Sequence, residues 1–234
     1  MKGIKIKDLM TGKFSQTFFR RYMLFMAGIF GSILTTAIFT FPGYTFFDYS
    51  ISALGSLIKN PNGWLLFSIA MWAQAFLVIP FFTHVWRVFK TYTPKLSILF
   101  LCAVVMTVMG LIMLGFFPED PSTSRMHYYS AGFAFGGFFI AACLSWATMG
   151  FMISRAPDVK RKKSIIISIP IMVVAFGFAI FGTGTAFYAT EVLAVDFGLL
   201  TNLFFWEWMF FSAIGVYILV LEIIISREIL EVKK

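Results

Sequence analysis

The stretch FPGYTFFDYSISALGSLIKNPNGWLLF, residues 41–67, decides the fold of this chain. It joins two apolar runs that are far longer than the buried face of a soluble helix requires. Between those runs lie one carboxylate, Asp48, two serines, Ser50 and Ser52, and a glycine, Gly55. We interpret this stretch as a polar connection at a membrane surface, where it forms the lip of an outward-facing cavity.

The composition indicates a protein whose solvent is largely lipid. Of the 234 residues, 59% are hydrophobic and only 13% are charged, which is too few to cover the apolar surface in water. The net charge is +8, but the basic residues alternate with the apolar runs and form no single patch, so we expect no nucleic-acid partner. Cys102 and Cys143 lie inside apolar runs and are expected to be packing residues.

Six apolar runs approach the roughly 20 residues that cross about 30 Å of hydrocarbon. They cover about residues 22–42, 64–86, 96–117, 127–150, 164–187 and 203–226. The runs lack the alternation of barrel strands, so the fold class is an all-α polytopic membrane protein with six transmembrane helices. The predicted organisation is a basic N-terminal segment (1–21), a transmembrane domain (22–226) and a tail (227–234).

The basic residues predict the orientation. If the N-terminus is cytoplasmic, then of the 19 lysines and arginines only Lys59 and Arg125 fall on the outer side. This asymmetry predicts that both termini are cytoplasmic. The short connections and the absence of a targeting tail favour a multi-pass protein of the cell membrane.

A second outer connection, GFFPEDPSTSRMHYYS at residues 115–130, carries the best candidates for chemistry. The sequence from Pro121 is typical of a helix start, which places His127 in the first turns of the fourth span. A histidine there could act as a base, bind a lipid phosphate when protonated, or hydrogen-bond a loop carbonyl. Glu119 and Asp120 are candidates to orient it.

Cofactor and metal chemistry finds little support in the sequence. The only histidines, His84 and His127, fall on opposite sides of the membrane and cannot share a metal, so we expect no metal site and no cofactor. The alternative that stays open is a carboxylate site at Asp48, Glu119 and Asp120 with His127. Motifs for a nucleophile or a phosphate loop are absent. Gln74 is the most polar side chain near the middle of a span, and it is either an interhelical hydrogen-bonding residue or part of a pathway.

Gly132 and Gly136 form a small-xxx-small face on the fourth span, followed by Gly137. Such a face lets another helix approach closely. The partner helix is either in the same chain or in a second protomer or complex subunit.

The runs DYSISALGSLIKNPNGWLLFSIA (48–70) and LGFFPEDPSTSRMHYYSAGFAF (114–135) resemble the prokaryotic membrane family of domain of unknown function 998. That family is distantly similar to the Frag/DRAM-like group, and the resemblance implies a six-helix bundle connected with lipids. The resemblance covers about the first two-thirds of the chain, and Ala53 departs from it where relatives often carry an acid. The matching positions are Ser50, Ile51, Ser52, Leu54, Gly55, Phe117, Pro118, Glu119 and His127.

Three functional hypotheses follow. The first is a protein that binds, transports or senses a membrane lipid or amphiphile in the outward-facing polar cavity. The second is a hydrolase or transferase acting on lipid headgroups, with His127, Glu119 and Asp120 as catalytic residues. The third is a structural or scaffold subunit that docks through Gly132 and Gly136. The expected ligand-binding residues are Asp48, Ser50, Ser52, Gly55, Glu119 and His127.

Overall fold

The protein is a bundle of long helices, seen here in a computed structural model that describes residues 6–155, 159–189, 198 and 202–231. Within these residues six helices are long and apolar enough to cross a membrane, which confirms the six predicted spans. They are α2 (Gln16–Phe39), α3 (Trp64–Tyr92), α4 (Pro94–Phe116), α5 (Ser124–Arg155), α6 (Val159–Phe187) and α7 (Leu203–Glu231). Two short elements add to them, α1 (Ile6–Met10) and the 3₁₀ helix η1 (Ser52–Gly55).

The helices extend past the apolar runs because polar groups at their ends find partners. Ser15 caps α2 by accepting a hydrogen bond from the Phe18 amide at 3.3 Å, so the helix begins before Arg20. Arg20 Nε in turn lies 3.3 Å from the buried carboxylate of Glu222 on α7. At the next corner, Pro94 begins α4 directly after Thr93, which ends α3.

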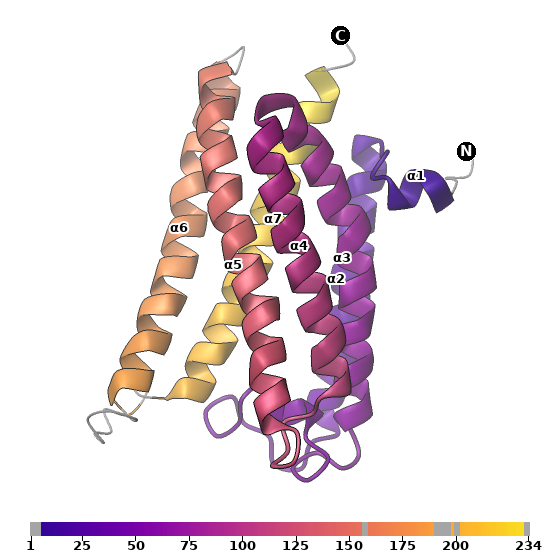
Figure 1. The fold of residues 1–234 in the computed structure, drawn as a ribbon, viewed down its shortest axis with the longest axis vertical. Coiled ribbons are helices and arrows are strands. Elements are labelled where there is room, and N and C mark those ends of the chain that lie inside the picture. Colours follow the sequence, from indigo (N-terminus) through magenta and orange to yellow (C-terminus); the bar gives the residue numbers. More distant parts are fainter. Residues whose placement is uncertain (1–5, 156–158, 190–197, 199–201, 232–234) are drawn as a thin grey trace.

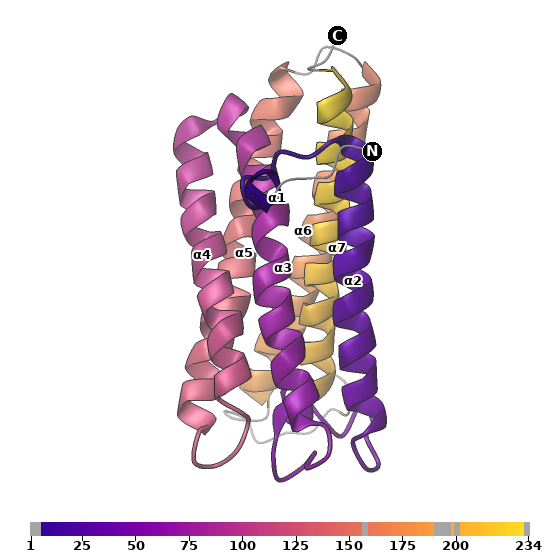
Figure 2. The same cartoon turned by 90° about the vertical axis from the view of Figure 1, so that its right-hand side faces the viewer.

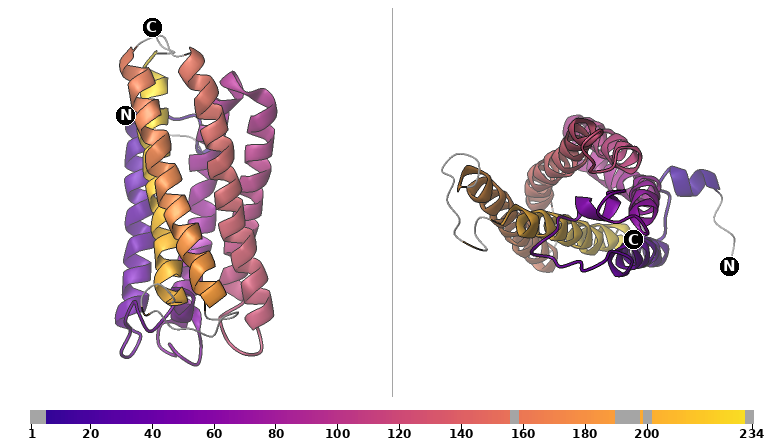
Figure 3. Two further views of the ribbon diagram at one scale, coloured as in Figure 1. Left: turned by 90° about the vertical axis from the view of Figure 1, so that its left-hand side faces the viewer. Right: turned by 90° about the horizontal axis from the view of Figure 1, so that it is seen from below.

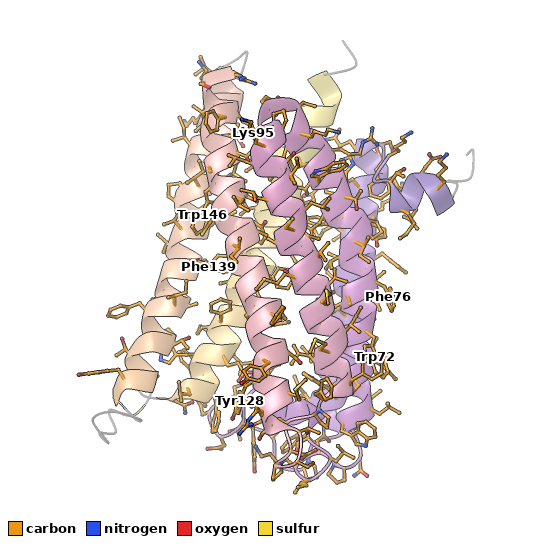
Figure 4. All side chains as sticks on the ribbon, in the orientation of Figure 1. Trp72, Phe76, Lys95, Tyr128, Phe139 and Trp146 are labelled. Carbon is orange, nitrogen blue, oxygen red and sulfur yellow. The ribbon has the colours of Figure 1, made fainter. Side chains whose placement is uncertain are left out.

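The bundle has two distinct ends (Figure 1). The terminal end carries α1 and the last turns of α7, and the η1 end carries η1 and the connection between α4 and α5. Figure 4 places Lys95 near the terminal end and Tyr128 near the η1 end. The basic segments therefore gather at one end, as the alternating charge pattern predicts.

The N-terminal segment is attached to the bundle at the terminal end, where α1 lies beside α3 (Figure 2). Gly12 makes the turn with φ +62°, and its carbonyl lies 2.6 Å from Nδ1 of His84. His84 is buried against the rings of Phe14 and Phe19. This histidine therefore holds the start of the chain against α3.

Helix packing leaves α6 at the edge of the bundle, against α7 and α5 (Figure 3). Helices α4 and α5 pack closely together, because a Cβ on Gly110 would clash with the backbone of Ala134 and one on Gly137 would clash with Thr107. Gly136 faces Met106 of α4, whereas Gly132 faces open space. Part of the predicted small-residue face is thus used within the chain.

Candidate functional site

Three serines of the connection between α2 and α3 each donate a hydrogen bond to a carboxylate from another part of the chain. We call this group the serine–carboxylate clamp, and its pairs are Ser50–Glu119, Ser52–Glu207 and Ser56–Asp120. The three serines are buried. The clamp fastens the segment that contains η1 across the η1 end of the bundle.

Asp120 is the most completely bonded of the three acids. Its Oδ1 accepts from Ser56 Oγ at 2.7 Å and from the Ile58 amide at 3.4 Å, and its Oδ2 accepts from the Leu57 amide at 3.0 Å. Only 7% of the residue is exposed. A buried carboxylate with this many donors is a structural anchor, because its acceptor positions are already used.

Glu119 bridges two parts of the same connection. Its Oε2 accepts from Ser50 Oγ at 3.1 Å, and its Oε1 lies 3.3 Å from Lys59 Nζ in a partly exposed ion pair. Ser50 Oγ also accepts from the Ala53 amide at 3.0 Å, which supports the first turn of η1. The structure therefore brings together two residues, Ser50 and Glu119, that the sequence assigns to one site.

Glu207 completes the clamp from α7. Its Oε1 accepts from both Ser52 Oγ, at 2.7 Å, and the Ser52 amide, at 3.1 Å. Glu207 is not among the site residues predicted from the sequence. The available signal was an acid in the opening turns of an apolar span, flanked by Trp206 and Trp208.

An aromatic contact supports the clamp from the side. The Tyr44 hydroxyl accepts a hydrogen bond from Trp208 Nε1 at 2.8 Å and lies 3.3 Å from the carbonyl oxygens of Tyr49 and Ser50. Burial raises the pKa of the Tyr44 phenol above its usual range, the Trp208 hydrogen bond lowers it, and the Glu207 carboxylate raises it further. The hydroxyl therefore stays protonated and can donate to these carbonyls.

His127 is buried beneath this connection. Its Nδ1 lies 2.8 Å from the carbonyl oxygen of Phe117, while its Nε2 has no hydrogen-bond partner among the described residues. Among the described residues, neither Glu119 nor Asp120 is hydrogen-bonded to the His127 ring, so the structure does not contain the predicted hydrogen bond from the histidine to an orienting acid. The observed contact fixes the turn before α5.

Two other predicted site residues lie apart from the clamp carboxylates. Asp48 is exposed, and its carboxylate accepts from the hydroxyl of Thr45 in a local turn. Gly55 is buried under α3, where a Cβ would clash with the Phe67 ring. Within the described residues, no group of three His, Cys, Asp or Glu side chains is placed to hold a metal ion.

Below the clamp, the bundle encloses an apolar cavity of about 380 Å³. Ser52 is the one predicted ligand-binding residue in its wall. The described lining carries no charged side chain and comes from α2, α3, α4, α5, α7 and the clamp segment. Its members are Met23, Leu24, Met26, Ala27, Phe30, Ile51, Ser52, Phe67, Met71, Gln74, Leu111, Leu114, Phe135, Phe138, Phe211, Ile214, Gly215, Ile218 and Leu219.

The exposed members of this lining lie on only two helices. Leu24 and Ala27 belong to α2, and Gly215 and Leu219 belong to α7. We call these four residues the portal. The portal lies along the spans of two neighbouring helices, so the cavity reaches the lipid-facing side of the bundle there.

The comparisons with known proteins identify one family. The family described as protein of unknown function (DUF998) matches residues 25–221, which extends the resemblance well beyond the first two-thirds of the chain. No curated protein and no solved structure matches the chain significantly, and the likeness to the Frag/DRAM-like group finds no support. With six membrane-type helices and a match over most of its length, the chain belongs to the DUF998 family of proteins of unknown function.

Proposed function

We propose that this protein binds a lipid or amphiphile, and that the apolar part of the ligand occupies the cavity below the clamp. The observation that carries the proposal is the combination of an apolar wall with a portal on two membrane-spanning helices. The volume falls in the range of about 300–1,000 Å³ that is typical of small-molecule sites.

The binding site then lies in the interior of the bundle and not in the polar connections. The clamp carboxylates and serines already bind one another, so they close the cavity at the η1 end and leave little polar surface for a ligand. Ile51 and Ser52 form part of that closure. A ligand would then enter from the membrane, between α2 and α7.

The nature of the wall supports a binding role over a packing defect. Protein interiors are normally close-packed, and an unfilled cavity lowers stability roughly in proportion to its volume. Met23, Met26 and Met71 line the cavity with flexible side chains that adapt to different apolar shapes. The wall is thus suited to an apolar guest.

We further infer that both termini face the cytoplasm and that the host is the cell membrane. The described basic side chains are concentrated at the terminal end, on α1, α2 and the connections near Lys95 and Arg155. At the η1 end, Lys59 is paired with Glu119 and the clamp adds two more acids. Such an asymmetry is typical of a cytoplasmic terminal end.

The enzyme and scaffold hypotheses receive less support from the contacts. Nδ1 of His127 is hydrogen-bonded to a backbone carbonyl, and neither Glu119 nor Asp120 makes a hydrogen bond that would orient the ring. Gly136 and Gly137 already receive α4 of the same chain. We therefore favour the binding protein.

The test is mass spectrometry of protein purified in mild detergent, with one portal variant and one matched control. In Gly215→Phe the new ring would fill the portal, and a Cβ there meets no atom within 4 Å. Gly150→Phe makes the same change at an exposed position of α5. A Cβ there also meets no atom within 4 Å, and the position is not part of the cavity lining. We expect a specific lipid in the wild type and in Gly150→Phe, and its loss in Gly215→Phe.

Two results would overturn the proposal. One is a wild-type protein that retains no specific lipid, and the other is equal retention by the two glycine variants.

A further inference from the structure

Gln74 is the polar side chain of the cavity lining that does not take part in the clamp. It lies on α3 about 15 Å along the helix from Trp64, at a rise of 1.5 Å per residue, which places it deep in the bundle. Only 9% of it is exposed, and it lines the cavity. Its Oε1 is buried and has no hydrogen-bond partner among the described residues.

The amide oxygen of Gln74 is thus a buried acceptor without a donor, and it lies beside a cavity that is large enough for a ligand that carries a donor. A polar atom without a hydrogen bond is costly in an apolar environment, and lipid offers it no water. A ligand that donates a hydrogen bond to Oε1 would remove that cost. The cavity, the depth of the residue and the unpaired oxygen all point to the same position for the ligand's polar group.

The charges around the cavity limit what that polar group can be. The described lining has no charged side chain, so a phosphate or carboxylate headgroup would be buried there without a counter-charge. At the clamp, the carboxylate of Glu207 is bonded to Ser52, a lining residue, which makes that end less favourable for an anion. Beside Gln74 itself, a cationic amine would also have no counter-charge in the described lining.

The uncharged donors of lipid chemistry are the hydroxyl group and the amide N–H, and the hydroxyl group is the smaller of the two. A hydroxyl can donate to the amide oxygen and also accept from the amide nitrogen, whereas a ketone or an ether can only accept. A single hydroxyl on an apolar body would satisfy Gln74 and leave the rest of the ligand against Phe, Met and Leu side chains.

We propose that the cavity takes an uncharged, long-chain alcohol whose hydroxyl group donates a hydrogen bond to Oε1 of Gln74. This inference rests on the proposed function, because it names the chemical class of the ligand in the same cavity. It makes Gln74 a specificity-determining residue.

The experiment compares two probes that share one apolar chain. The first is 1-dodecanol and the second is dodecyl methyl ether, which lacks the donor. Equilibrium binding of each radiolabelled probe is measured on protein in lipid nanodiscs, after subtraction of empty nanodiscs, for the wild type, Gln74→Met, Gly215→Phe and Gly150→Phe. Methionine keeps the length and the flexibility of the glutamine side chain without its amide.

We expect the wild type and Gly150→Phe to prefer the alcohol by about fivefold, the size of one net hydrogen bond. Gln74→Met should bind both probes equally, and Gly215→Phe should bind neither. Equal binding of the two probes by the wild type, with loss of both in Gly215→Phe, would overturn the role of Gln74 and leave the cavity as a binding site. An alcohol preference that persists in Gln74→Met would also overturn it. Failure of both probes to bind the wild type would overturn both proposals.

Discussion

The η1 end and the cavity beneath it treat polar groups in opposite ways. At the η1 end, three carboxylates and three serines bind one another and the backbone. In the cavity, one amide lies among apolar side chains with its oxygen unpaired. A concentration of polar residues in a membrane protein can therefore fasten the fold, whereas a single polar residue in an apolar cavity is a candidate contact for a ligand.

The largest expected effect comes from breaking the clamp at its most buried acid. Asp120→Ala leaves the Ser56 hydroxyl and the Leu57 amide without their acceptor, and each such group costs about 1–3 kcal/mol. We expect a loss of stability on the order of 3 kcal/mol, seen as a lower midpoint of thermal unfolding in detergent. The matched control is Asp48→Ala, since that acid is exposed and bonded only locally. Equal midpoints for the two variants would contradict the anchor role of Asp120.

In the cavity, a substitution is expected to raise the stability of the protein instead of lowering it. Gln74→Met removes an amide whose oxygen has no partner, so the ligand-free protein should gain about 1 kcal/mol of stability. The measurement is the thermal midpoint after extended detergent washing to remove bound lipid. A loss of stability in this variant would show that Gln74 has a partner within the fold, and the contrast between the two regions would fail.

A smaller loss is expected at the closure itself. Ser52→Ala removes one donor to Glu207, which keeps the hydrogen bond from the Ser52 amide, so the cost should be about 1 kcal/mol. Ser124→Ala is the control, because that hydroxyl donates only to the nearby Pro121 carbonyl. The measurement is the midpoint of thermal unfolding of the two variants. A midpoint that falls further in Ser124→Ala than in Ser52→Ala would contradict the role of Ser52 in the clamp.

The smallest effect is expected for the exposed ion pair. Lys59→Met removes the partner of Glu119, but Lys59 is 41% exposed at its side chain and water screens the pair. The change should be about 0.5 kcal/mol or less and should shrink as salt is raised. A loss as large as that of Asp120→Ala would mean that this pair, rather than the buried bonds, holds the connection.

The sequence predicted the spans well and the site in part. The six spans follow from runs of apolar residues, because side chains that meet hydrocarbon must be apolar over the length of the span. Each run forms a helix because lipid offers no hydrogen bonds to the backbone, and a helix satisfies its own. Ser50, Ser52 and Glu119 lie at one end of the bundle, and Ser50 and Glu119 are in contact. Glu207 was missed as a partner because it lies 155 positions after Ser52, and no local pattern links the two.

The number of spans, the gathering of charge at the ends of the bundle and the family follow from the amino-acid sequence. Those properties depend on neighbouring residues and on length. The fold in three dimensions is needed to see that the polar connections close upon themselves, that the cavity is apolar, and that its portal lies between α2 and α7. The reason is physical: hydrogen bonds and cavities are made by groups that are distant in the chain, and packing alone determines which of them meet.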